Sequence, residues 1–290
     1  MKGFRPSPAP RHVGAKRPGS RETGPGNQVM TDAIFAEPGP LAFIADVAIL
    51  LALIYPANLI AYFGMGFALL RINDTHPDRR IQKRRDGLRR AIPEMKESCV
   101  SILVTSTLLA LALTLQGHGL TLWTPWSGIL GVLAGTALMV VGYDTYYYFA
   151  HRALHTKALY RFHQWHHRSV APTAWSSDSQ SVGETVLIQS FQVIAAVLLP
   201  IPAWALILHR VYDHVNGQLG HVGYEYFADR TTRFPSPMVC TTYHDLHHEK
   251  FRWNFGNYFS FWDRVMGTLE PDYDARVAAM DPKNDARPAE

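Results

Sequence analysis

Three apolar stretches dominate the pattern of hydrophobic and polar positions along the chain. Residues 39–70 contain one charged side chain, Asp46, and residues 98–143 contain none. A membrane-spanning helix needs about 20 apolar residues. The first stretch therefore predicts one span, and the second predicts two spans that are separated by a turn at residues 117–119. Buried helices of a soluble core are the competing interpretation, and so long an uncharged run disfavours them.

The basic residues predict how these spans are oriented. Residues 71–96 carry nine basic and four acidic side chains, whereas the turn at 117–119 carries no Lys or Arg. Short loops rich in Lys and Arg lie on the cytoplasmic side of a membrane. We therefore expect the 71–96 loop to be cytoplasmic and the turn and the N-terminus to lie outside. The third span, roughly 127–148, then returns to the cytoplasm.

Composition supports a membrane protein and excludes several kinds of site. Hydrophobic residues make up 47% of the 290 residues and charged residues 18%, where a soluble domain has about 25% charged residues. The two cysteines, Cys99 and Cys240, form no CxxC or CxxCH pattern. A disulfide framework, a thiolate zinc site and a covalently attached haem are therefore not expected.

Eight of the fourteen histidines lie in three short motifs, one HxxxH and two HxxHH. Positions i, i+3 and i+4 share one face of a helix, so each motif is expected to direct its imidazoles to one side. Imidazole binds first-row metals well, and eight ligands are too many for one ion. The pattern predicts two neighbouring ions. The eight histidines are His151, His155, His163, His166, His167, His244, His247 and His248. His118 has no partner in these motifs.

The third apolar stretch, residues 185–208, separates the second histidine motif from the third. It is broken by Pro200 and Pro202, and proline disrupts a helix interior. A single crossing would leave the two motifs on opposite sides of the membrane. We therefore predict a re-entrant or shallow helical hairpin that enters and leaves on the same face.

At these residues the chain resembles the fatty acid hydroxylase/sterol desaturase superfamily. The resemblance runs from about residue 71 to about 270 and includes residues 144–152 (DTYYYFAHR), 254–256 (NFG) and 262–268 (WDRVMGT). Members are integral membrane oxidoreductases that act on lipids with O2, reducing equivalents and a histidine-ligated di-iron centre. The resemblance therefore implies two iron ions as cofactor and O2 as co-substrate.

The superfamily also carries histidines between its two HxxHH motifs, and His214 and His221 are the candidates here. His221 begins a His-x-Gly-Tyr-Glu run that looks like the corresponding stretch of the sterol C4-methyl oxidase branch. The resemblance thus implies ten candidate ligands.

Carboxylates are expected behind the ligands, because a ligating imidazole usually donates its other N–H to an acceptor. Asp144 is the first candidate for this role, and Asp245 and Asp263 follow. Further candidates are Asp178, Glu184 and Asp213. For each of them the alternative is a solvated or helix-capping acid.

These expectations define the partners. We expect a lipid substrate and a membrane location, and we expect no nucleic-acid partner. Since the sequence holds no flavin, haem or iron–sulfur motif, electrons must come from an external donor of the ferredoxin or cytochrome b5 type with its reductase. The alternatives are a metal-dependent lipid enzyme of another reaction type and a metal-binding membrane protein without oxygenase activity. A transporter is disfavoured, because it would place its ligands inside the spans, whereas the histidine motifs lie just outside them.

The expected architecture is all-α. A transmembrane helical bundle with a re-entrant hairpin would carry a cytoplasmic helical cap that holds a histidine-ligated dinuclear metal site. Residues 1–29 would form a disordered basic tail, with Met30 as an alternative translation start. Residues 30–96 would hold the first span and the basic loop, 97–270 the fatty acid hydroxylase-like catalytic domain, and 271–290 a polar tail.

Overall fold

The computed structural model describes residues 39–281. Within this part of the chain helices are joined by turns, and the only strand-like pairings are two isolated bridges, Arg80 with Tyr224 and Met238 with Phe259. The all-helical prediction is therefore confirmed. The basic tail at residues 1–29 and the alternative start at Met30 lie outside the described residues.

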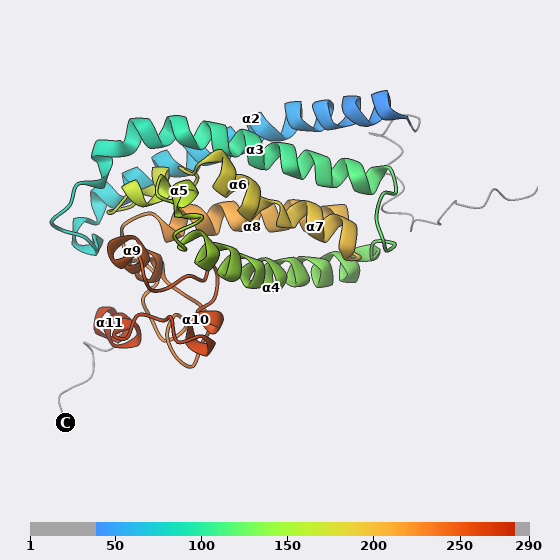
Figure 1. Cartoon of the computed structure of the whole chain (residues 1–290). Helices are drawn as coiled ribbons and strands as arrows, with labels where there is room; N and C mark the ends of the chain where they lie inside the picture. The colour runs from blue at the N-terminus through green and yellow to red at the C-terminus, as the bar shows by residue number, and fades with distance from the viewer. Residues whose placement is uncertain (1–38, 282–290) are drawn as a thin grey trace, which may run out of the picture.

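Three long helices are apolar enough to cross a membrane, in agreement with the three predicted spans. They are α2 (Pro40–Thr75), α3 (Ala91–Gly117) and α4 (Gly128–Leu154), and they lie lengthwise in the bundle (Figure 1). The shorter helices are α5 (Tyr160–His163), α6 (Val182–Gln189), α7 (Phe191–Leu198), α8 (Ala203–Gly220), α9 (Thr241–Lys250), α10 (Phe261–Val265) and α11 (Tyr273–Met280).

Asp46, the single charge of the first apolar stretch, is buried in α2 and pairs with His118 at the end of α3. Asp46 Oδ2 lies 2.7 Å from His118 Nε2. A buried charge is costly unless it is paired, so this contact makes the charge tolerable there. The motif pattern assigned His118 no partner among the histidines. Its partner is a carboxylate 72 positions away in the sequence, which becomes apparent only once the two helices pack together.

Trp175 joins α2 to α3. Its ring is fully buried, and its carbonyl oxygen accepts hydrogen bonds from the hydroxyls of Tyr62 (2.8 Å) and Ser98 (3.2 Å). A Cβ atom added at Gly66 would overlap the Trp175 ring, whereas one at Gly64 would meet nothing within 4 Å. The close approach of α2 to Trp175 therefore requires glycine at position 66.

The substitution Gly66→Ala should lower the stability of the bundle by about 1–3 kcal/mol, the usual cost of overpacking. Gly64→Ala is the matched control on the exposed side of the same helix. Because alanine has a higher helix propensity than glycine, this variant should have unchanged or slightly raised stability. Thermal unfolding of both variants in one detergent measures this difference. Equal midpoints would contradict the packing of Gly66 on Trp175.

The segment predicted as a hairpin folds back on itself. α6 and α7 run away from the histidines, residues 199–202 turn the chain, and α8 runs back (Figure 1). The turn is attached to the connection between α3 and α4, because Leu122 N donates to Val197 O (2.8 Å) and Trp126 N to Pro200 O (3.0 Å). Both open ends of the hairpin consequently lie at the histidine end of the bundle.

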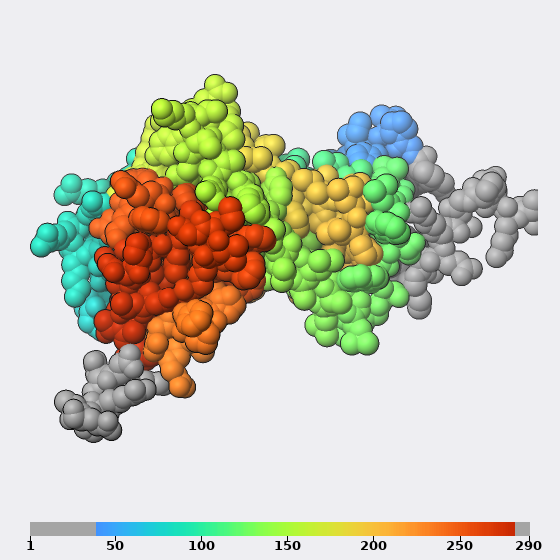
Figure 2. Space-filling view, turned by 60° about the horizontal axis from the view of Figure 1, so that its bottom comes forward, coloured from blue at the N-terminus to red at the C-terminus, as the bar shows by residue number. Residues whose placement is uncertain are grey.

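The C-terminal segments gather at this same end, where Figure 2 shows them in orange and red. Residues 273–280, expected to belong to a polar tail, instead form α11. Tyr273 and Val277 of α11 are buried against Cys240, Tyr243 and Leu246. A short helix with two buried positions has too weak an apolar pattern to be distinguished from a tail in the sequence.

Candidate metal centre

Nine histidines from four parts of the chain converge at the end of the bundle. They come from the end of α4, from α5 and the 3₁₀ turn after it, from the end of α8, and from α9. Their ring nitrogens form two groups, and within each group these atoms all lie within 4.8 Å of one another. The first group is His151, His155, His163, His167 and His247, and the second is His166, His221, His244 and His248.

Each HxxHH motif is divided between the two groups. Its first and last histidines, four positions apart, enter one group, and the histidine three positions after the first enters the other. The expectation that every motif directs all its imidazoles to one side is therefore wrong. In α9 successive positions are rotated by about 100°, so positions i+3 and i+4 diverge, and the other motif runs from the end of α5 into a 3₁₀ turn. The imidazole at i+3 therefore enters one group, and those at i and i+4 enter the other.

Within the groups the Nε2 atoms face one another at short range. The distances are 3.1 Å between His151 and His163, and 3.2 Å between His166 and His221. Another pair, His221 and His244, lies 2.9 Å apart. Two ligands at right angles on one ion, with metal–nitrogen bonds of about 2.1 Å, lie about 3.0 Å apart. The spacing therefore fits nitrogens that share an ion.

The other ring nitrogen determines which tautomer these histidines adopt. In the first facing pair, His151 Nδ1 donates to the carbonyl oxygen of Phe255 (2.9 Å) and His163 Nδ1 to the carboxylate of Glu184 (2.7 Å). In the second, His221 Nδ1 donates to Gly217 O (2.7 Å). His166, the other histidine of this pair, has its Nδ1 3.3 Å from Ser179 O, so all four rings place Nδ1 beside an oxygen acceptor.

A neutral imidazole that donates through Nδ1 has only a lone pair at Nε2. The facing Nε2 atoms therefore repel one another, and a cation between them would convert this repulsion into attraction. The donor set fits first-row metal ions, which neutral imidazole binds well.

Burial keeps these imidazoles neutral. It lowers the pKa of His155 to about 3 and that of His221 to about 4. Burial also lowers the pKa values of the six histidines in the two HxxHH motifs, and repulsion from neighbouring imidazoles adds to it. These six are His163, His166, His167, His244, His247 and His248. Neutral rings are the form that binds metals.

Among the described residues, Glu184 is the one acid whose side chain forms a hydrogen bond with a histidine of either group. Its partner is His163. The three favoured candidates have other partners. Asp144 accepts from the backbone N–H groups of residues 257–259, and Asp245 accepts from the Gln82 side chain. Sequence spacing ranked Asp144 first because it precedes His151 on α4, but its side chain turns to a different segment.

Asp263 organises the loop that holds His151. It accepts hydrogen bonds from Phe255 N (2.9 Å), from Gly256 N (2.7 Å) and from the hydroxyls of Tyr243 and Thr268. Because Phe255 O accepts from His151, Asp263 acts on the histidine through the backbone. The NFG segment at residues 254–256 was the sequence signal for this loop.

His214 lies outside both groups. Its Nδ1 lies 3.4 Å from Arg210 Nη2, and a guanidinium beside an imidazole disfavours a metal cation at the same ring. The structure thus brings together nine of the ten candidate ligands.

The substitution Asp263→Ala should destabilise the protein strongly. It leaves the buried Phe255 N–H without an acceptor, leaves the Gly256 N–H with the Tyr243 hydroxyl alone, and removes the acceptor of that hydroxyl. Each buried group left unpaired costs about 1–3 kcal/mol. Asp74→Ala, at an exposed position, is the control and should have no effect. Thermal unfolding of the two variants measures the difference, and an unchanged midpoint for Asp263→Ala would contradict this role.

Comparisons with known proteins agree on one family. Residues 136–268 match the fatty acid hydroxylase family. A methylsterol monooxygenase of Aspergillus fumigatus is 30% identical over 163 residues, 53% of either chain. Methylsterol monooxygenase 1 of Rattus norvegicus is 32% identical over 129 residues, 43% of either chain. The chain thus spans about half the length of these curated relatives. No solved structure matches it.

Proposed function

Because the chain belongs to the fatty acid hydroxylase/sterol desaturase superfamily, we propose that it hydroxylates or desaturates a membrane lipid with O2 and external electrons. The observation that carries this proposal is the convergence of nine histidines into two adjacent groups. Names of relatives that include methylsterol monooxygenases favour a sterol as the lipid.

Each histidine group would hold one iron ion. Bound iron would supply the redox chemistry with O2 that oxidation of an unactivated C–H bond requires and that no side chain provides, whereas zinc is redox-inert. The protein's own contribution is positioning. Glu184 and the carbonyl groups of Phe255, Gly217 and Ser179 orient the rings by accepting their Nδ1–H groups. The buried surroundings exclude bulk water.

The proposed membrane placement follows from charge. Helices α2, α3 and α4 would cross the bilayer, with the basic connection at residues 76–90 and the histidines on the cytoplasmic side. The hairpin of α6, α7 and α8 would then be re-entrant, because both its open ends lie at the histidine end. Its attachment at Val197 and Pro200 to the α3–α4 connection would bring its turn near the opposite face.

An external electron donor of the ferredoxin or cytochrome b5 type would complete the reaction. A groove of about 980 Å³ beside α9 supports this part of the proposal, because six basic side chains outnumber three acidic ones, Asp78, Glu225 and Glu249, in its lining. Thr242 and Leu246 of α9 line the groove. Because a helix is about 10–12 Å across, a donor bound there would lie about one helix diameter from the histidines. The basic lining residues are Arg79, Arg80, Lys83, Arg84, Arg85 and Arg276.

The first test is iron content combined with turnover. The purified protein should hold two irons per chain. Given a lipid extract and a ferredoxin or cytochrome b5 donor with its reductase, it should consume O2 and form an oxidised lipid. His166→Ala should abolish product formation and lower the iron content, because only three histidines remain in the second group. His76→Ala, at an exposed position, is the control and should retain both. Full activity of His166→Ala would refute its assignment, and the absence of any iron- and O2-dependent product would refute the oxygenase proposal.

The second test concerns Glu184. Glu184→Ala should weaken iron binding by about 10–100-fold, the usual effect of removing an acceptor behind a ligand. Glu184→Gln keeps an oxygen acceptor and should retain most of the affinity. Competition with a chelator measures both affinities, and equal losses in the two variants would contradict orientation through a hydrogen bond.

A further inference from the structure

A stripe of apolar side chains runs along the exposed face of α8. Trp204, Leu208, Val211 and Val215 are between 38% and 57% exposed, and their spacing of four, three and four places them on one helix face. Such a surface marks contact with lipid or with another protein. Leu219, one turn further along α8, continues this face.

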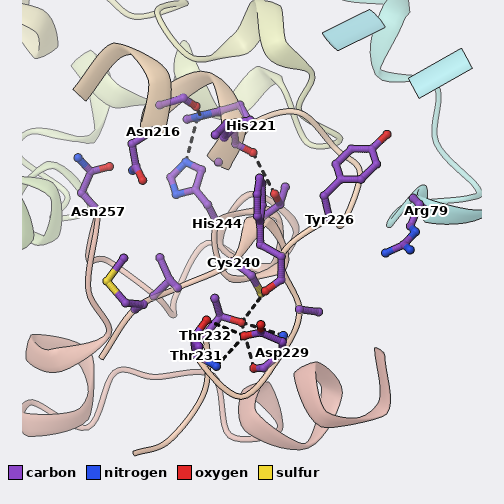
Figure 3. A pocket seen from close by; sticks show the side chains of 18 of the residues that line it. Arg79, Asn216, His221, Tyr226, Asp229, Thr231, Thr232, Cys240, His244 and Asn257 are labelled. Carbon is purple, nitrogen blue, oxygen red and sulfur yellow. Dashed lines mark hydrogen bonds between the residues drawn. The ribbon is translucent and has the colours of Figure 1, made fainter. Parts of the chain in front are cut away.

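The stripe ends at a cavity of about 510 Å³, which Leu219 helps to line. Figure 3 shows His221 and His244 together at one end of this cavity. Both histidines belong to the second group, so the cavity leads to the group that has four members rather than five. Asn216 and Asn257 lie near them, and Asp229, Thr231 and Thr232 lie at the other end (Figure 3).

Two exposed apolar side chains from the segment between α8 and α9 also line the cavity. They are those of Phe227 and Met238, which are 45% and 41% exposed. Phe261 on α10 is a further exposed apolar residue, and α10 is attached to the third span because Trp262 Nε1 donates to Thr145 Oγ1 (3.1 Å). An exposed apolar side chain of α10 thus lies on an element that is attached to the third span.

We propose that a sterol enters this cavity sideways from the bilayer and comes to rest against His221 and His244. We place the mouth of the cavity between the end of the α8 stripe and the exposed side chains of Phe227 and Met238, which line the cavity. A cavity of this volume is within the range of about 300–1,000 Å³ that encloses one compact ligand. The inference rests on the proposed function for its substrate class, and it adds the entry route and the group that the substrate meets.

Photolabelling tests the route without requiring turnover. The full chain is placed in phosphatidylcholine nanodiscs that contain a sterol with a diazirine in its ring system, illuminated, digested and analysed by peptide mass spectrometry. Labels are expected on both walls of the cavity, within residues 215–221 and 226–244. Labelling of the exposed faces of the spans without either wall would overturn the proposal.

Tryptophan substitutions test the mouth. Leu219→Trp should reduce labelling of both walls several-fold by filling the entrance. Because Leu219 also packs against the core cluster that contains Leu69 and Val222, a second variant is needed. Val215→Trp, at the end of the stripe nearest the cavity, changes a residue that is 38% exposed and belongs to none of the core clusters. Leu133→Trp on α4, where Leu133 is 57% exposed, is the matched control and should leave wall labelling unchanged.

The outcomes separate this inference from the proposed function. The route would be overturned if both mouth variants left the labelling of the cavity walls undiminished, whatever the iron and O2 measurements give. Wall labelling that is lost in the mouth variants would support the route even in a protein that forms no oxidised product, and in that case the oxygenase proposal alone would fail.

Discussion

Repulsion between imidazole lone pairs that face one another is the constraint on which the site depends. Carbonyl groups and Glu184 accept the Nδ1–H of His151, His163, His166 and His221, which leaves bare Nε2 atoms about 3 Å apart. No hydrogen bond can form between two such lone pairs. The fold therefore holds nitrogens in an arrangement that a bound cation would stabilise, and metal binding would then be coupled to folding stability.

The bundle makes this arrangement possible by returning distant segments to one end. α4 delivers His151 and His155, and the hairpin turns back so that α8 delivers His221 beside the second motif. α9 then supplies histidines to both groups. Because the hairpin turn is attached to the α3–α4 connection, the depth of the hairpin and the position of His221 are linked.

Local sequence patterns were sufficient to predict the three long helices, the break at Pro200 and Pro202, and eight of the nine histidines that gather at the site, whereas His221 came from the family resemblance. They were insufficient where side-chain direction decides the outcome. Asp144 lies seven positions from His151 and Glu184 lies 21 positions from His163, but of these two acids only Glu184 turns toward its histidine. The division of each HxxHH motif, the pairing of Asp46 with His118, and the packing of α11 likewise depend on contacts between distant segments, which spacing alone does not encode.

The central claim is that the two histidine groups each bind one iron ion. Anomalous X-ray diffraction from crystals of the iron-loaded protein, collected above and below the iron absorption edge, tests it most directly. The account predicts two iron peaks per chain, one surrounded by the group that contains His151 and the other by the group that contains His166. A single peak, a peak outside both groups, or no iron signal from protein with intact histidines would contradict it.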